Sequence, residues 1–194
     1  DRIDQFIREK NPQTAVVVGA GFIGLEMVEA LVRRGLEVTL VEKAPQVMPN
    51  LEAEISAVLM KEMLDYGVDL QLGISLKEIG GNRVILEDGT LLKGDLILLS
   101  VGVKPTLRLA LDAGLSIGPA GGLLVDERLQ TSDPNIFAAG DMVEIENAIT
   151  KKSARVPLAG PANRQGRIAA ENALGGSKKY RGTFLTSTVK FFDI

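Results

Sequence analysis

Three observations predict an α/β fold built on a parallel sheet. A β-branched, apolar run at residues 13–18 is typical of a strand buried on both faces. It leads into a glycine-rich turn at residues 19–24 and a helical pattern, and a second apolar strand follows at residues 36–41. These parts make a βαβ unit of normal length. The third observation is a β-meander of short strands joined by hairpin-type turns, at residues 76–79, 83–86 and 91–93.

The remaining elements follow from apolar spacing and from Gly and Pro punctuation. Further helices are expected within residues 1–9 and at about 52–66, 106–113 and 161–174. Further strands are expected at residues 68–72, 95–101, 123–125, 136–139 and 189–192. A Gly/Pro stretch at residues 118–122 is the best candidate for a domain boundary. We therefore expect a connector helix at 1–9, one domain at 10–116 and a second portion at 117–194.

Composition excludes several kinds of function. The chain has 194 residues, a net charge of -3 and no block of basic residues, so nothing in its charge favours nucleic acid or an anionic membrane surface. It has no Cys and no His, which removes the thiolate nucleophile, the zinc–sulfur site and the commonest general base. We expect no metal site, no catalytic residue in this chain and a cytoplasmic location. Any redox chemistry must be carried by a cofactor.

The glycine turn is the strongest functional signal. Gly19, Gly21 and Gly24 have the spacing G-x-G-x-x-G between a strand and a helix. The first glycine permits a tight turn, the second lets the backbone approach a pyrophosphate, and the third allows close packing of the helix on the strand. The helix then presents free N–H groups to the ligand. We therefore predict a Rossmann-like dinucleotide site, which also includes Phe22 and Ile23 of the same turn.

An acid at the end of the second strand indicates which dinucleotide is bound. Glu42 lies 21 residues after Gly21, in the range expected for a carboxylate that accepts hydrogen bonds from an adenosine ribose. A carboxylate there would repel the 2′-phosphate of NADP. The neighbouring Lys43 works against this preference, and we place it among the cofactor-binding residues. The pattern favours NADH.

Two further acids have both a structural and a functional interpretation. Glu26 lies near the start of the helix behind the glycines, where an acid is favourable in any case and where it could also contact the nicotinamide. Asp141 follows the small residues 138–140 at the end of an expected strand. It could accept a hydrogen bond from a ligand hydroxyl or form an Asx turn.

Five motifs occur in a fixed order along the chain. They are GAGFIGLE at residues 19–26, VGVKP at 101–105, QTSDP at 130–134, IFAAGD at 136–141 and PLAGPANRQGR at 157–167. Together they resemble the FAD-dependent pyridine nucleotide–disulfide oxidoreductases, in the branch of coenzyme A-disulfide reductases and NADH oxidases. The likeness covers nearly the whole chain.

The resemblance implies roles for individual segments and residues. Residues 10–116 would be the NAD(H)-binding domain, and residues 117–194 the C-terminal part of a split FAD-binding domain. Phe22 would be an aromatic gate over the flavin, while Glu26 and Gly102 would lie near the nicotinamide. The residues implied on the FAD side are Asp141, Ala159 and Gly160, with Asp141 at the ribityl chain and the other two near the isoalloxazine.

The resemblance also implies what the parent enzyme does. NADH would pass hydride to FAD, which would reduce a disulfide-type acceptor (coenzyme A disulfide or persulfide) or oxygen. The family's FAD fingerprint and redox cysteine precede the NAD domain, and its homodimerisation domain follows the FAD domain. We therefore expect an internal fragment that is inactive alone. Leu185 departs from the family pattern, which has a Gly in the run G-T-x-G-T-S.

Two other functions remain open from the residues. A freestanding NAD-binding sensor or interaction module would need residues 117–194 to fold independently, although that segment carries the flavin-site motifs. A flavin-free dehydrogenase would need a substrate domain with an acid–base group, and none is visible.

Overall fold

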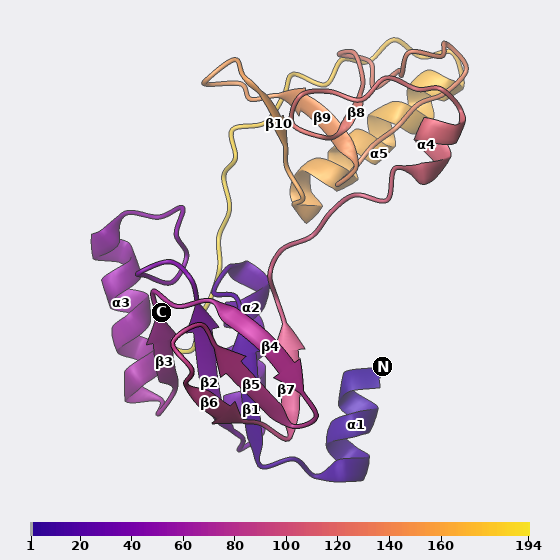
Figure 1. Cartoon of the computed structure of the whole chain (residues 1–194). Helices are drawn as coiled ribbons and strands as arrows, with labels where there is room; N and C mark the ends of the chain where they lie inside the picture. Colours follow the sequence, from indigo (N-terminus) through magenta and orange to yellow (C-terminus); the bar gives the residue numbers. More distant parts are fainter. Residues whose placement is uncertain (1) are drawn as a thin grey trace. The chain divides into compact units, whose positions relative to one another are not determined.

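The computed structural model describes residues 2–194. Contacts divide the chain into two compact units: the first comprises Asp1–Val103 with Val189–Ile194, and the second comprises Lys104–Thr188. The chain therefore leaves the first unit after Val103, well before the Gly/Pro stretch at 118–122, and returns to it for its last six residues (Figure 1). The assignment of residues 10–116 and 117–194 to NAD and FAD portions stays a prediction.

The first unit is built on a four-stranded parallel sheet with the order β3-β2-β1-β7. Its strands are β1 (Thr14–Val18), β2 (Glu37–Glu42), β3 (Asp69–Leu72) and β7 (Leu96–Leu99). β1 is central, and its Val17 is paired with Leu40 on one side and Leu98 on the other. The predicted α/β fold with a parallel sheet is confirmed.

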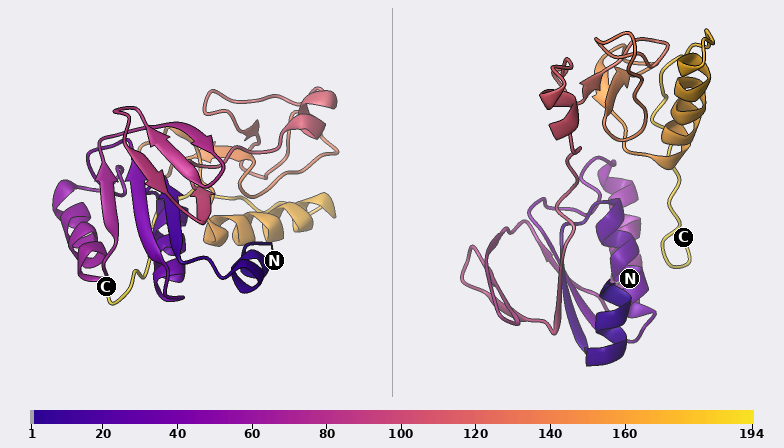
Figure 2. Two further views of the ribbon diagram at one scale, coloured as in Figure 1. Left: turned by 60° about the horizontal axis from the view of Figure 1, so that its bottom comes forward. Right: turned by 90° about the vertical axis from the view of Figure 1, so that its right-hand side faces the viewer.

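Two different layers cover the two faces of this sheet, as the right panel of Figure 2 shows. On one face, Ala15 and Val17 join a core with α2 (Phe22–Val32) and α3 (Ala53–Asp65), and α1 (Arg2–Lys10) packs at its margin. On the other face, Val16 and Val18 pack against the antiparallel meander. The meander strands are β4 (Leu76–Gly80), β5 (Arg83–Leu86) and β6 (Leu91–Lys93). Alternate residues of β1 therefore pack into two different cores, one on each face of the sheet, and this explains why residues 15–18 are all apolar.

The last residues of the chain are a buried anchor of the first unit. Phe191 and Phe192 are 1% and 0% exposed and belong to the helix-side core. Phe192 stacks on Tyr66 with ring centroids 3.9 Å apart, and the Tyr66 hydroxyl donates a 2.5 Å hydrogen bond to Asp193. The prediction of a strand at residues 189–192 is wrong, because these side chains pack against helices and their backbone joins no sheet.

The second unit has less regular structure. It contains α4 (Arg108–Asp112), α5 (Ala159–Ala173) and a small sheet ordered β10-β9-β8. The strands are β8 (Leu123–Leu124), β9 (Val143–Glu146) and β10 (Ser153–Arg155), and the last two were not predicted. The strand predicted at residues 136–139 is wrong: one isolated bridge, between Gln130 and Phe137, is formed there.

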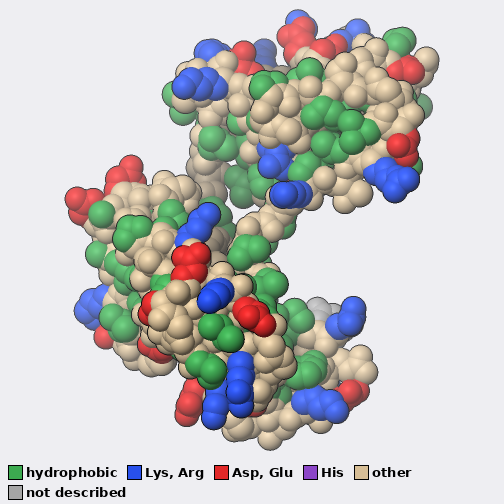
Figure 3. All heavy atoms as spheres, viewed as in Figure 1, with side chains coloured by type: hydrophobic (Ala, Val, Ile, Leu, Met, Phe, Trp, Pro, Cys, Tyr) green, Lys and Arg blue, Asp and Glu red, His purple; other side chains and the backbone are tan. Residues whose placement is uncertain are grey.

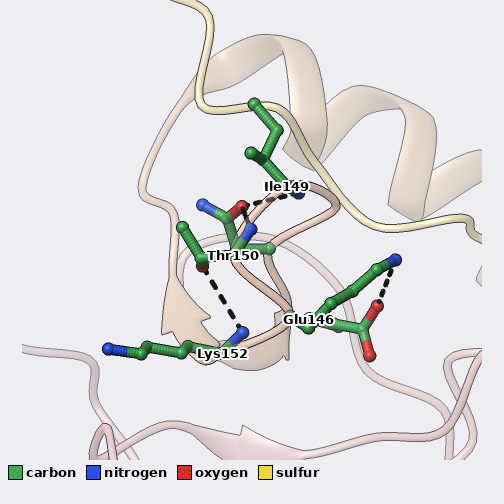
Figure 4. Close-up of polar contacts among 6 residues, drawn as sticks. Glu146, Ile149, Thr150 and Lys152 are labelled. Carbon is green, nitrogen blue, oxygen red and sulfur yellow. Dashed lines mark hydrogen bonds and ion pairs between the residues drawn. The ribbon is translucent and has the colours of Figure 1, made fainter.

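Buried polar side chains hold the loops of the second unit. Figure 4 shows the turn after β9, where Asn147 Oδ1 accepts hydrogen bonds of 2.9 Å from the backbone N–H groups of Ile149 and Thr150. Glu144, which is 1% exposed, accepts a 2.6 Å bond from the Ser153 hydroxyl and a 3.1 Å bond from the N–H of Gly122. These contacts take the place of a long β-ladder.

On the face shown in Figure 3, acidic, basic and apolar side chains are intermixed over both units. Large apolar side chains with more than half of their surface exposed include Val101, Leu109, Leu174 and Phe184. None of the helices within residues 2–194 has the length and apolar character needed to cross a lipid bilayer.

Candidate dinucleotide-binding site

The sheet order reverses at β1 and β7, and the carboxyl ends of these two strands are therefore the expected ligand position. From β1 the chain moves outward to β2 and β3, and it then returns to β7 on the other side of β1. Open α/β sheets bind ligands at such a reversal of strand order. The glycine turn follows β1 here, and Gly102 follows β7. The Ser100 N–H donates a 2.7 Å hydrogen bond to the carbonyl of Val18, which fixes the two strand ends side by side.

Two of the three glycines are required by the backbone itself. Gly19 has a φ of +103°, and a Cβ on it would overlap the backbone of Ser100. A Cβ on Gly24 would overlap the carbonyl oxygen of Gly19. The turn, the start of α2 and the end of β7 therefore meet at distances that exclude any side chain.

Gly21 has a different role. Its φ of -81° is accessible to any residue, and a Cβ on it would have no heavy atom of the described chain within 4 Å, its immediate neighbours apart. It is the N-cap of α2, and no side chain among the described residues caps this helix end. The first N–H groups of a helix have no intrahelical acceptor. The missing side chain at Gly21 thus leaves an open cradle in front of donors that suit an anion.

Glu42 links this turn to the loop after β2. Its Oε2 accepts a 2.8 Å hydrogen bond from the N–H of Ala20, and its Oε1 accepts a 2.9 Å bond from the N–H of Ala44. The side chain is 8% exposed. Since each carboxylate oxygen can accept two hydrogen bonds, one position on each remains for a ligand hydroxyl. The sequence predicted a carboxylate at this place, but it gave no signal that Ala20 and Ala44 would orient it.

The other predicted dinucleotide residues differ in exposure. Phe22 is half-buried, and Ile23 is 48% exposed beside the turn. Glu26 is exposed on α2, one turn behind the glycines, and Lys43 is exposed directly after β2. Gly102 is exposed and has a φ of +100°, so it turns the chain sharply at the end of β7.

The predicted flavin-side residues lie in the second unit. Asp141 is exposed and follows Gly140, whose N–H donates a 2.8 Å hydrogen bond to Gln165 Oε1 of α5. A Cβ on Gly140 would lie 3.8 Å from Ala162, so this loop runs close to the first turns of α5. Ala159 and Gly160 begin that helix and are exposed, and no described side chain caps it. Gln165, which sequence reasoning missed, is 1% exposed and joins the two segments.

The first unit therefore has the architecture of a dinucleotide-binding α/β domain. A family model described as pyridine nucleotide-disulphide oxidoreductase matches residues 1–166, and the chain belongs to this family. The resemblance drawn from the five motifs is confirmed.

Individual relatives agree with this assignment. The chain is 34% identical, over 99% of its length and 44% of the relative's, to a protein named NAD(P)H sulfur oxidoreductase (CoA-dependent) of Pyrococcus abyssi. It also matches the crystal structure of reduced Bacillus anthracis CoADR-RHD, with 44% identity and a TM-score of 0.95. That match covers 100% of this chain and 35% of the other. The chain also matches the water-forming NADH oxidase of Lactobacillus brevis bound to NADH, with 31% identity, a TM-score of 0.90, and coverage of 98% and 43% of the two chains. The chain thus spans less than half the length of the relatives it matches.

Proposed function

We propose that the first unit binds NADH and that this chain is the electron-donor portion of a flavin-dependent oxidoreductase. The observation that carries the proposal is the open cradle at Gly21, in front of an uncapped helix and between two glycines that the backbone requires. A pyrophosphate fits such a cradle because backbone N–H groups and the helix dipole both favour negative charge. The residues present therefore fit the dinucleotide.

We also propose that Glu42 selects NADH over NADPH. Two backbone N–H groups hold its carboxylate at the end of β2, so the negative charge has a fixed position. A ribose with two hydroxyls can donate to the free positions of the carboxylate, whereas a 2′-phosphate would be repelled. Glu26, Phe22, Ile23, Lys43 and Gly102 surround the rest of the ligand in this proposal.

The second unit would supply part of an FAD site. Asp141 would accept a hydrogen bond from the ribityl chain, and the uncapped start of α5 at Ala159 and Gly160 would face the isoalloxazine, where its dipole favours negative charge. FAD, when bound, supplies the step from hydride donor to acceptor. The acceptor would be a small-molecule disulfide or persulfide such as that of coenzyme A, or oxygen. A homodimeric parent and a cytoplasmic location complete the proposal.

The cradle is tested by filling it. Gly21→Val adds a side chain whose Cβ meets no heavy atom of the described chain within 4 Å, its immediate neighbours apart, and which would occupy the ligand's position. We expect the dissociation constant for NADH, measured by its fluorescence, to rise more than about tenfold, which is about 1.4 kcal/mol. Gly80→Val is the matched control, since it also adds a side chain in open space, in β4. Equal NADH affinity of the Gly21→Val variant and the unaltered chain would refute the site.

Two further measurements separate the parts of the proposal. Equal affinities for NADH and NADPH would refute the role of Glu42 while leaving the cradle intact. The 194-residue chain should bind NADH and oxidise none of it when acceptor is added without flavin. Robust turnover under those conditions would contradict the need for a flavin and for a redox cysteine supplied by another part of the parent.

A further inference from the structure

The second unit contains a cavity that none of the proposed NAD or FAD contacts uses. It has a volume of about 590 Å³ and lies between one side of α5, at residues 161–168, and the segment 179–186. Small-molecule sites commonly have volumes of roughly 300–1,000 Å³, so the cavity is large enough for a metabolite.

Four positively charged side chains line this cavity, and three of them form no ion pair within the described chain. Arg164 and Arg167 lie one turn apart on α5, and Arg181 comes from the facing segment. None of these three guanidinium groups takes part in an ion pair with any residue of the described chain, from Arg2 to Ile194. Lys179 also lines the cavity, but its amine pairs with Glu127. No Asp or Glu is among the lining residues of the described chain.

Three arginines around one cavity suit a phosphate group. Their mutual repulsion is relieved when a dianion binds between them, and the planar guanidinium matches phosphate oxygens in a bidentate geometry. Thr186, whose side chain carries a hydroxyl donor, also lines the cavity. Beside these groups, Phe184 exposes 66% of its surface and Ile168 is half-buried, so the cavity also offers an apolar wall.

We propose that this cavity binds a phosphorylated small molecule, with its phosphate between Arg164, Arg167 and Arg181 and an organic ring against Phe184. The proposal does not rest on the NADH site, because all of its residues belong to the second unit.

The first test is a titration of the 194-residue chain with phenyl phosphate and with inorganic phosphate, followed by NMR. The Nε–Hε signals of the three arginines report directly on the cavity. We expect these signals to shift in a saturable way with both probes, and phenyl phosphate to bind more tightly because its ring contacts Phe184. Signals that do not saturate, or that move equally for arginines outside the cavity, would overturn the proposal.

Variants assign the contacts. Arg164→Gln and Arg167→Gln should each weaken phenyl phosphate binding about tenfold, as expected for the loss of a charge-assisted hydrogen bond. Lys152→Gln removes an exposed cation of the same unit that does not line the cavity, and it should leave the affinity unchanged. An equal loss in all three variants would mean that net charge alone attracts phosphate, which would refute a built site.

The variant Phe184→Ala tests the apolar wall of the cavity. Phe184→Ala should make the affinities for phenyl phosphate and inorganic phosphate equal, and a preserved difference would refute the ring contact. Gly21→Val separates this site from the NADH site. It should raise the dissociation constant for NADH more than about tenfold and leave the affinity for phenyl phosphate unchanged. Loss of both ligands in that variant would refute an independent cavity.

Discussion

The two compact units are stabilised in different ways. The first unit has a parallel sheet with a core on each face, and its strands run in register for four or five residues. In the second unit, β8 and β9 pair over two residues and β9 and β10 over three. Its loops are held instead by buried polar side chains, namely Glu144, Asn147, Gln165, Asn172 and Thr183. The first unit therefore depends mainly on apolar packing, whereas the second combines an apolar core around Leu123, Val143 and Ile145 with specific hydrogen bonds that hold its loops.

This difference predicts which residues are most sensitive in each unit. Loss of apolar volume should matter most in the first unit, since its interior is close-packed and a cavity there has no polar group to compensate. Loss of a hydrogen-bonding partner should matter most in the second unit, because each orphaned N–H or hydroxyl is then buried without an acceptor.

The largest effect is expected from Phe192→Ala. The ring is 0% exposed, stacks on Tyr66 and contacts Phe191 edge to face with centroids 4.6 Å apart. Its removal should lower the free energy of unfolding of the first unit by about 3–5 kcal/mol, measured by urea denaturation. Phe184→Ala is the matched control, since that ring is 66% exposed in the second unit, and it should change the unfolding free energy by less than about 0.5 kcal/mol.

If Phe192→Ala lowered the unfolding free energy as little as Phe184→Ala, the proposed dependence of the first unit on apolar packing at this place would be wrong. That result would mean that the last six residues rest on the first unit without contributing to its core. Hydrogen exchange locates the effect, because the amides of α2 and α3 should lose protection while those of β9 keep it.

An intermediate effect is expected from Glu144→Gln. Burial raises the pKa of this carboxyl group, but the hydrogen bonds from Ser153 and from the N–H groups of Gly122 and Ala120 outweigh burial, so the pKa lies below the ordinary 4.5. A Gln in this position would direct an NH₂ group at a donor. We expect a loss of about 1–3 kcal/mol in the unfolding free energy of the second unit at neutral pH.

The effect of Glu144→Gln on the unfolding free energy should depend on pH. A carboxyl group with a lowered pKa in the folded state stabilises the fold above the unfolded-state value of about 4.5, and this stabilisation is lost as the pH falls through the folded-state value. The difference between the unaltered chain and Glu144→Gln should therefore shrink in urea denaturation below pH 4.5. Glu146→Gln, at an exposed position of the same strand, is the control and should show little difference at any pH. A pH-independent loss at Glu144 would rule out the charge as the cause.

The same contrast explains how far the sequence could predict the structure. In the first unit the side-chain period, the glycine spacing and Glu42 all point to the same βαβ unit. β1 and β2 lie within one residue of the predicted ranges, and the predicted helix lies between them as α2. Local pattern and tertiary structure agree there, because long strands and helices impose their period on the sequence.

In the second unit the decisive contacts are individual side chains, and these leave no period. β9 was missed because Glu144 looks like an exposed acid, although Ser153 and Gly122 make its burial favourable. Residues 136–139 are apolar but have a single bridge partner, and residues 189–192 are apolar because Phe191 and Phe192 join a distant core. Neither partner can be identified from the local sequence.

The smallest effect concerns Leu185, which stands where the resemblance led us to expect a glycine. Leu185 has a φ of +57°, in the left-handed region that favours glycine, and a weak 3.4 Å hydrogen bond from its N–H to the Thr183 hydroxyl is its local support. The expected glycine would therefore have a backbone reason, and Leu185 adopts the conformation with strain of about 1 kcal/mol. Leu185→Gly should relieve this strain and raise the unfolding free energy of the second unit by less than that amount, because glycine also gains entropy in the unfolded chain. Leu174→Gly is the control, because φ is negative there and the side chain is 90% exposed, so this change adds unfolded-state entropy without relieving strain. Urea denaturation of both variants therefore separates the relief of strain from the entropy of the unfolded chain. Equal destabilisation by both changes would show that the left-handed conformation of Leu185 carries no strain.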